Sequence, residues 1–409
     1  MPTPLLLRSY FITTILSSPR LLKISMPLLN IIANSPSRFL NPDKNPLIGL
    51  LVRKIIYEHF VSGDSEAAVK KTVAQMKQVG YQGVILGYAK EFAADEGEVG
   101  NDELDVRRWK EGYEKTMDMI GPGDFMAVKL SGAGASTLSA LANKQPPPPQ
   151  MWKEMLSLCH TAKVKNIRVW IDAEQQDLQP TIDEWTLLLM REFNINGQAF
   201  MYNTFQAYLK STPGNILRYL RIAQDEGLVL GIKLVRGAYI ATERRELIHD
   251  TLEETHQAYD GIVEKLLRRE YPGLNGNKSY PDVALMLASH NETSIKSAYA
   301  IQKSMIEKGR STIKLEYGQL QGMADEISCD LLQLCERGEK GVGEKRSEME
   351  ERLRPRAFKC LAWGSTQECL QFLLRRVKEN GDAVSRTGGW VVGFRKEILR
   401  RLKVNFGVD

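Results

Sequence analysis

The sequence predicts an α/β fold in which eight parallel strands, each followed by a helix, close into a barrel. From about residue 64 onward, short apolar runs alternate with stretches that carry apolar residues at helical spacing. Continuous apolar runs are typical of parallel strands that are buried on both faces. Eight such units fit a single barrel, and the 409 residues are long enough for it. A doubly wound open sheet is the alternative, but it more often has five to seven strands.

The expected strands and helices follow one another in strict alternation. The strands are expected at Gln82–Tyr88, Asp124–Leu130, Ile167–Ile171, Gln198–Thr204, Leu228–Val235, Val283–Ala288, Ser311–Glu316 and Ala357–Leu361. The helices with clear periodicity are expected at Ser65–Val79, Asp102–Met119, Ile182–Glu192, Asn215–Asp225, Thr255–Arg269, Glu292–Lys308, Met323–Leu334 and Thr366–Glu379. Two segments interrupt this order. Pro146–Pro149 predicts a short, extended loop, and the charge-rich stretch Glu336–Arg356 predicts a solvated loop or frayed helix.

The N-terminal segment differs from the rest in composition. Residues 1–42 contain no Asp or Glu, and they carry Arg8, Arg20, Lys23 and Arg38 together with several serines. This composition is typical of a mitochondrial presequence, whereas Arg8 interrupts the apolar run that a secretory signal would need. We therefore expect residues 1–44 to be a targeting segment that is disordered or cleaved, and residues 45–409 to form the barrel. An untidy terminus without a targeting role is the alternative.

Composition excludes several other classes of protein. The net charge is only +5, from 55 basic and 50 acidic residues, so nucleic acid is not an expected partner. The five cysteines form no CxxC pair, which argues against a disulfide framework or a structural zinc site. No run of 18 apolar residues is present, so no transmembrane helix is expected.

The barrel prediction also says where chemistry should lie, because the active sites of such barrels form at the carboxyl ends of the strands. Polar residues end or follow seven of the eight expected strands, and six of these strand ends supply ionisable or amide groups. They are Lys129, Asp172, Glu174, Gln206, Lys233, Arg236, Tyr239, Ser289, His290, Asn291, Gln319, Gln321 and Trp363. The expected mouth is basic and rich in amides, which suits an anionic cofactor or substrate. The sequence has no phosphate-binding P-loop, nucleophile elbow or HExxH helix, and no metal site is expected.

The last predicted helix carries two adjacent arginines followed by an acid. Arg375 and Arg376 stand four and three residues before Glu379, so all three can share one helical face. One interpretation is an exposed face with a weak surface ion pair. The other is a clamp in which both guanidinium groups bind a substrate carboxylate while Glu379 faces an amine.

Six segments together resemble the proline dehydrogenase family, most closely its fungal mitochondrial branch. They are IDAEQQDLQP, NTFQAYLKST, KLVRGAYIATERR, ASHNE, YGQLQGMADE and LLRRVKENGDAVSRT, and the resemblance extends from about residue 45 to the C-terminal end. It implies a distorted barrel with additional N-terminal helices and a final helix over the mouth. It also implies non-covalent FAD, oxidation of L-proline to Δ1-pyrroline-5-carboxylate by hydride transfer from C5 to flavin N5, and electron delivery to ubiquinone at the matrix side of the inner mitochondrial membrane.

The resemblance assigns roles to residues motif by motif. The residues that it places along the cofactor are Gln206, Lys233, Arg236, Gly237, Ala238, Ser289 and His290. It places Lys129, Asp172 and Tyr239 at the reacting centre, and Leu320 in an apolar wall of the substrate pocket. It favours the clamp interpretation for Arg375, Arg376 and Glu379.

One position departs from the family pattern. Relatives commonly place a tyrosine over the proline ring four residues before the glycine at Gly364, and this chain has Cys360 there. The thiol is much smaller than a phenol, so either the pocket is wider or another residue, such as Trp363, fills it. A flavin dehydrogenase acting on 4-hydroxyproline or a related cyclic amino acid is therefore the alternative function. A non-enzymatic barrel is the rival class, but every main motif is present.

Overall fold

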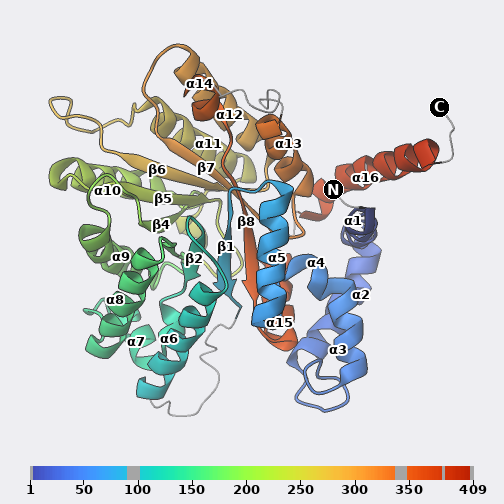
Figure 1. Ribbon diagram of the computed structural model, residues 1–409. Coiled ribbons are helices and arrows are strands. Elements are labelled where there is room, and N and C mark those ends of the chain that lie inside the picture. Colours follow the sequence, from blue (N-terminus) through green and yellow to red (C-terminus); the bar gives the residue numbers. More distant parts are fainter. Residues whose placement is uncertain (1–2, 90–101, 337–347, 380–382, 406–409) are drawn as a thin grey trace.

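The barrel that the sequence predicts is present in the computed structural model, which describes residues 3–89, 102–336, 348–379 and 383–405. Eight parallel strands pair in sequence order, and β1 pairs with β8 to close the sheet. Helices surround the barrel, as Figure 1 shows. The prediction of a closed (βα)8 barrel, rather than an open doubly wound sheet, is confirmed.

The strand bounds agree with the sequence prediction to within a few residues. The strands are β1 (Gly83–Tyr88), β2 (Phe125–Val128), β3 (Arg168–Ile171), β4 (Met201–Gln206), β5 (Leu230–Val235), β6 (Val283–Ala288), β7 (Lys314–Leu320) and β8 (Ala357–Trp363). The differences at the carboxyl ends matter for the site. The fourth strand extends to Gln206 and the seventh to Leu320, so both residues lie on rigid strand ends at the mouth.

The outer helices follow the expected order. They are α5 (Glu66–Val79), α6 (Asp102–Asp118), α7 (Ala135–Ala142), α8 (Pro149–Val164), α9 (Gln179–Phe193), α10 (Thr212–Glu226), α11 (Leu252–Arg268), α12 (Glu292–Glu307), α13 (Asp325–Glu336), α14 (Glu348–Leu353) and α15 (Thr366–Glu379). Short 3-10 helices occur at Ser131–Ala133 (η2) and Arg245–Leu247 (η3). The proline run forms an irregular segment up to Pro148, and Pro149 begins α8. In the charge-rich stretch, α14 is helical, and residues 337–347 lie outside the described part.

The amino-terminal end of the barrel is closed by a charged plug. Arg168, the first residue of β3, donates to both carboxylate oxygens of the buried Glu316, at 2.9 and 2.7 Å. Its guanidinium lies 3.7 Å from the ring centroid of Phe125. Above this plug the interior is filled by side chains such as Trp170, Tyr202 and Phe358. Within the described residues, the side chains thus close the barrel interior at its amino-terminal end.

The N-terminal segment that was expected to be a targeting sequence is helical and packs on the barrel. It contains α1 (Thr3–Leu16), α2 (Pro19–Asn34) and α3 (Pro46–Val52), followed by a π-helix, η1 (Arg53–Tyr57), and α4 (Glu58–Phe60). A targeting role for this segment stays a prediction. None of the helices in the described ranges combines the length and the apolar character that a bilayer crossing requires.

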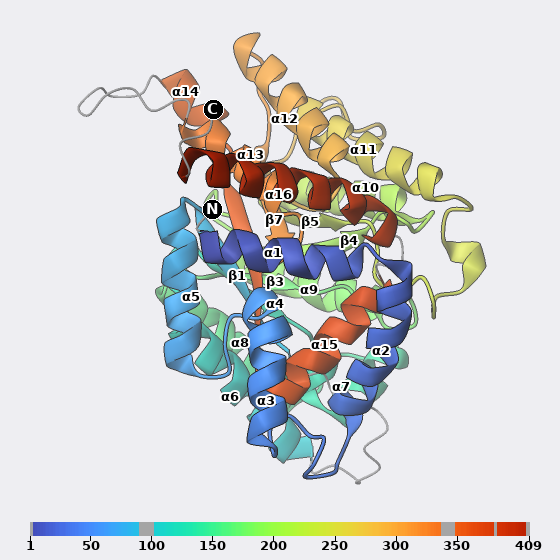
Figure 2. The same cartoon turned by 90° about the vertical axis from the view of Figure 1, so that its right-hand side faces the viewer.

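Two helices at the C-terminal end complete this side of the molecule. Figure 2 shows α1 and α16 (Ala383–Asn405) lying side by side across the barrel, with α15 and α2 crossing nearby. Asp43 caps α15 from outside, because its carboxylate accepts from the backbone N–H groups of Thr366 and Gln367, at 3.0 and 3.3 Å. The expectations of N-terminal helices and of a final helix at the mouth are confirmed.

Candidate active site

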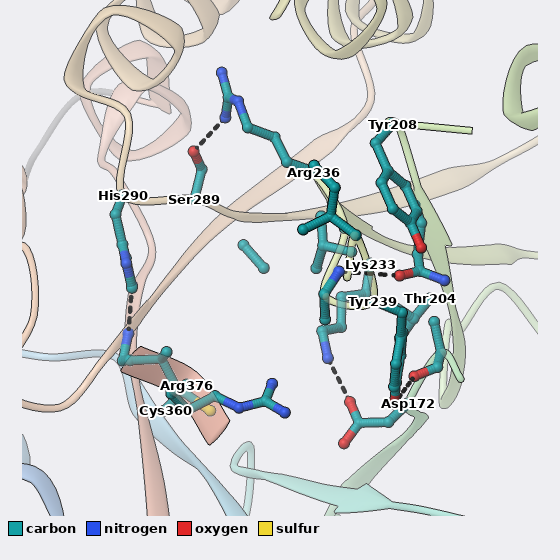
Figure 3. A pocket seen from close by; sticks show the side chains of 18 of the residues that line it. Asp172, Thr204, Tyr208, Lys233, Arg236, Tyr239, Ser289, His290, Cys360 and Arg376 are labelled. Atoms are coloured by element: carbon teal, nitrogen blue, oxygen red, sulfur yellow. Dashed lines mark hydrogen bonds and ion pairs between the residues drawn. The ribbon is translucent and has the colours of Figure 1, made fainter. Parts of the chain in front are cut away.

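A cavity of about 530 Å³ opens at the carboxyl ends of the strands. Thirteen of the fifteen residues that the sequence assigned to cofactor or substrate line it: Lys129, Asp172, Gln206, Lys233, Arg236, Gly237, Ala238, Tyr239, Ser289, His290, Leu320, Cys360 and Arg376. The volume lies within the range of small-molecule sites, about 300–1,000 Å³. In Figure 3, His290, Cys360 and Arg376 lie on one side of the cavity, and Lys233, Tyr239 and Asp172 lie on the other.

An ion pair joins two strands at the centre of the site. Lys233 Nζ, on β5, lies 2.5 Å from Asp172 Oδ1, directly after β3. The same ammonium lies 4.0 Å from the ring centroid of Trp170, so the aromatic face holds it from one side. The Lys233 side chain is only 11 % exposed, and that of Asp172 is 30 % exposed. The lysine charge is thus fixed at the cavity wall rather than free in solvent.

A second cation is held by hydroxyl groups farther along the cavity. The guanidinium of Arg236 donates to Ser289 Oγ and Ser294 Oγ, both at 2.8 Å, and its Nε contacts His256 Nδ1 at 2.9 Å. None of these three partners is an anion, so these hydrogen bonds do not neutralise the guanidinium. An arginine in the wall of a cavity is a group that can bind an anion.

His290 connects the ends of two neighbouring strands. The backbone N–H of Leu320, at the end of β7, donates to Nε2 of His290 at 3.1 Å (Figure 3). Ser289, the preceding residue, also accepts from the backbone of Asn291 through its hydroxyl, at 3.1 Å. The pair therefore sets the position of Leu320, which the resemblance assigns to the substrate pocket.

The loop after β5 is shaped by Gln206 and by a glycine. Ala238 N–H donates to Gln206 Oε1 at 3.2 Å, and Gln206 Nε2 donates to the Glu174 carbonyl at 3.1 Å. Gly237 has a φ of +150°, and a Cβ at this position would collide with the ring of Tyr208. Only glycine fits there without strain. The loop is thus pressed close to β4, and Tyr239 follows with its hydroxyl 3.3 Å from the Ala173 carbonyl.

Lys129 is positioned by aromatic residues of α6. Its backbone N–H donates to the Tyr113 hydroxyl at 2.9 Å, and its carbonyl accepts from the Trp109 indole at 3.0 Å. These two bonds fix the end of β2, from which the lysine side chain lines the cavity.

The predicted arginine pair is split by the helix that carries it. Arg376 lines the cavity together with Phe372 and Val377 of α15, whereas Arg375 is not part of the wall. In Figure 3, Arg376 and Asp172 extend into the cavity from opposite sides. Glu379 is the last residue of α15, and its side chain lies outside the part of the chain that the structure describes.

Cys360 faces the cavity from β8 and is half-buried. Burial raises the pKa of its thiol to about 11, an effect that the nearby Lys233 opposes. The suggestion that Trp363 fills the space beside this small residue is wrong. Trp363 stands three residues along the same strand and so points to the opposite face. It stacks on Tyr88 at 4.6 Å and donates to Thr116 Oγ1 at 2.9 Å.

Three other residues predicted at the mouth do not form the described cavity wall. Gln319 and Gln321 alternate with Leu320, so they point outward, where they contact Ser328 and the Val61 carbonyl at 3.3 and 3.1 Å. Glu174 turns away and accepts from the backbone of Ser131 at 3.2 Å. Burial raises the pKa of its carboxyl. A position at the end of a strand therefore does not by itself place a residue at the mouth, because some of these side chains point to the helices outside the barrel.

Several residues that line the cavity were not predicted from the sequence. They are Tyr208 and members of the connection from β5 to α11, including Ile248, His249 and Thr251. Two signals could have indicated them. Tyr208 stands two residues after Gln206, and the connection of residues 236–251 is longer than most loops in such folds.

A family model described as proline dehydrogenase matches residues 69–388. The chain belongs to the proline dehydrogenase family. The probable mitochondrial proline dehydrogenase of Schizosaccharomyces pombe is 27 % identical, over 97 % of this chain and 88 % of that protein. The mitochondrial proline dehydrogenase 1 of Caenorhabditis elegans is 30 % identical over 62 % of this chain, but the match spans only 38 % of that protein.

The family also includes relatives named for another substrate. The hydroxyproline dehydrogenase of Xenopus laevis is 31 % identical, over 59 % of this chain and 46 % of that protein. Among solved structures, proline utilization A from Bdellovibrio bacteriovorus has a TM-score of 0.65 at 14 % identity, over 89 % of this chain and 37 % of that one. The structural likeness supports the same barrel fold.

Proposed function

We propose that the chain is an FAD-dependent dehydrogenase that oxidises L-proline to Δ1-pyrroline-5-carboxylate and passes the electrons to ubiquinone. The observation that carries this proposal is the charge arrangement in the cavity. Arg376 lines the cavity from α15, and the Lys233–Asp172 ion pair lines it from the strand ends. The apolar Leu320, at the end of β7, forms part of the wall between β6 and β8. A small amino acid with one carboxylate and one cyclic apolar part matches this set.

The residues fit a flavin dinucleotide. Its diphosphate is anionic, and the guanidinium of Arg236, held by two serine hydroxyls, offers a cation in the wall. Among the described residues, the buried Nε2 of His249 has no hydrogen-bond partner, although His249 lines the cavity. A ligand in the cavity would satisfy it. Gly237 and Ala238 allow close approach of the backbone, and Gln206, Lys233, Ser289 and His290 complete the residues that would hold the group.

The chemistry that bound FAD supplies is acceptance, at its N5, of the hydride that leaves C5 of proline. The protein supplies binding and orientation. Arg376, with Arg375 and Glu379 as the rest of the proposed clamp, holds the substrate carboxylate and amine. Leu320 and Cys360 bound the ring, and Tyr239 closes the pocket from the loop after β5. Lys129, Lys233 and Asp172 set the charge around the reacting centre.

The proline nitrogen must lose a proton before the hydride leaves. A carboxylate near the amine, such as Asp172, stabilises the cationic form, so binding and deprotonation compete. Lys233 lies 2.5 Å from Asp172, and its positive charge offsets part of the negative charge of that carboxylate. The carboxylate then stabilises the cationic amine less strongly, so the amine loses its proton more easily. The pair thus balances recognition of the amine against its deprotonation.

Oxidation of 4-hydroxyproline is the second candidate function, and Cys360 is the observation that favours it. A cysteine in place of the family's tyrosine leaves room beside the ring, and Trp363 does not occupy that room. Purified protein tested with both amino acids, with a soluble dye as electron acceptor, distinguishes the two functions.

The proposed place of action is the matrix side of the inner mitochondrial membrane. The acid-free composition of residues 1–42 supports import, and relatives named mitochondrial support the same compartment. Ubiquinone is dissolved in the bilayer, so delivery of electrons to it requires that the protein contact the membrane peripherally.

A further inference from the structure

The outward face of the N-terminal helices is apolar. On α2, Leu21, Ile24, Leu28 and Ile31 recur at helical spacing and are 45, 72, 57 and 56 % exposed. An adjacent face of the same helix is already covered, because Leu29, Ile32 and Ala33 pack in one cluster with Leu370 of α15. The helix therefore has two apolar faces, of which the protein covers one.

The neighbouring helices also carry exposed apolar side chains. Leu7 and Phe11 are exposed on α1, Leu47, Leu50 and Leu51 on α3, and Phe39 between α2 and α3. Eleven of the 23 large hydrophobic side chains that are exposed in the described residues lie within residues 7–51. Figures 1 and 2 place α1, α2 and α3 on the same side of the molecule. Exposed large hydrophobic side chains are thus concentrated on this side of the molecule rather than spread evenly over it. We call this side, formed by α1, α2 and α3, the N-terminal face.

The charge on this face is positive. Arg20, Lys23, Arg38, Lys44 and Lys54 are exposed. The acids of residues 3–60 are engaged within the protein. Glu58 pairs with Arg8 at 2.6 Å, and Asp43 caps α15. An apolar helix face bordered by lysine and arginine fits the interface of an anionic bilayer. A second copy of the chain would bring the same positive charge to the contact, so the charge opposes self-association.

The N-terminal face also adjoins the cavity. Thr13 of α1 and Leu22 of α2 line it, together with Phe372 of α15. The helices whose outer sides are apolar thus form the rim of the proposed active site with their inner sides. If the electron acceptor is lipid-soluble, as the proposed function holds, it can approach the cavity along these helices.

We propose that α1, α2 and α3 dock on an anionic lipid bilayer, with the α2 stripe in the interface, and that residues 3–44 stay in the mature protein. Retention follows from the packing. Leu6, Ile12, Leu22 and Ala33 are buried. Asn41 donates to Gln367 at 2.8 Å. Loss of the segment would uncover α15 and the rim of the cavity. The membrane part of this proposal rests on the proposed function, and the packing part does not.

The test is co-flotation of the full chain with vesicles of phosphatidylcholine, with and without about one fifth cardiolipin. The variant carries Ile24→Glu and Leu28→Glu. A control carries Val164→Glu and Leu188→Glu, which add the same charge at exposed apolar positions on α8 and α9. We expect the wild type and the control to float with the cardiolipin vesicles. The variant, and the wild type with pure phosphatidylcholine, should float at least tenfold less.

Three results would overturn the proposal. The first is equal flotation of the variant and the wild type. The second is a variant that turns an oligomer into a monomer without a change in flotation, which would identify a second copy as the occupant. The third is cleavage near residue 44 after import of the full chain into isolated mitochondria, judged by intact mass. Proline-dependent reduction of a soluble dye is measured in parallel. Flotation without dye reduction would refute the proposed function alone, and dye reduction without flotation would refute the docking alone.

Discussion

The ammonium of Lys233 lies between the carboxylate of Asp172, at 2.5 Å, and the ring of Trp170, at 4.0 Å. The three residues come from two strands that are separated by β4 in the barrel. A closed barrel brings the carboxyl ends of β3 and β5 to one mouth. The side chain of Lys233 therefore reaches from β5 across β4 to the residues at the end of β3. The positive charge at the centre of the site is therefore set by the fold itself.

The first prediction concerns this pair. Asp172→Asn keeps a hydrogen-bond acceptor but removes the charge, so Lys233 loses its ionic partner. Charge-assisted hydrogen bonds contribute about 1.5–3 kcal/mol, and we expect kcat/KM for proline to fall roughly ten- to a hundredfold. The control is Asp118→Asn, whose carboxylate pairs with Lys165 on the surface at the same 2.5 Å. If both variants keep wild-type kinetics, the Lys233–Asp172 pair has no part in the reaction.

The second prediction concerns the arginine pair. Arg376→Met should raise KM for proline by about ten- to a hundredfold, because a guanidinium in the cavity wall is lost. Arg375→Met should have a smaller effect, since Arg375 is not in the wall. Arg191→Met, which removes a surface pair with Glu226, is the control. Flavin content is measured for each variant. An unchanged KM for Arg376→Met would assign α15 a purely structural role.

The third prediction concerns substrate choice. Cys360→Tyr should narrow the pocket and raise the preference for proline over trans-4-hydroxyproline, by about 1–3 kcal/mol in kcat/KM. Trp363 lies outside the cavity, so the added ring should not meet it. The measurement is kcat/KM for both substrates in the wild type and the variant. An unchanged ratio with retained activity would mean that Cys360 does not contact the ring.

The fourth prediction concerns His59, a buried residue of α4. Its Nε2 lies 3.1 Å from the carbonyl of Gly322, next to the segment that carries Leu320, and burial lowers its pKa. As the pH falls below about 6.5, the unfolded chain binds a proton that the folded protein does not. The free energy of unfolding should then fall, by at most about 1.4 kcal/mol per pH unit from this group.

His59→Gln should remove that part of the slope, because glutamine does not titrate. The measurement is urea unfolding from pH 7.5 to 5.5, beside the control His160→Gln on the exposed side of α8. Parallel slopes for the wild type and His59→Gln would contradict the assignment.

The fifth prediction concerns import. Residues 1–45 fused to a fluorescent reporter should carry it to mitochondria, because the segment is basic and free of acids before Asp43. Replacing Arg20 and Lys23 by Glu should reduce import severalfold. A reporter that stays in the cytosol would remove the segment's targeting role, and it would leave the packing of α1 and α2 unaffected.

The barrel could be predicted because its signal is local and repeated. Continuous apolar runs such as VALMLA at Val283–Ala288 identify a buried parallel strand directly. Most site residues followed, since they stand at strand ends. Gln319 and Gln321 were wrongly predicted at the mouth for the same reason. Side chains alternate between the two faces of a strand, so a residue one position from Leu320 points away from the cavity.

The N-terminal helices could not be placed from the sequence. Their composition resembles a presequence, and their contacts are with α15 and α16, more than 300 residues away along the chain. The wall around His249 was missed for a related reason. It lies on an irregular connection whose shape depends on Arg245, which donates to the carbonyls of His249 and Asp250 at 2.7 and 2.6 Å.

The visible spectrum of the purified protein tests the central claim most directly. The proposed function predicts the visible absorption of a bound flavin, and its bleaching when proline is added without oxygen. In Arg376→Met the flavin should remain, and bleaching at the same proline concentration should be much slower. A protein that folds but stays colourless after incubation with FAD would contradict the account. So would a yellow protein that neither proline nor 4-hydroxyproline bleaches.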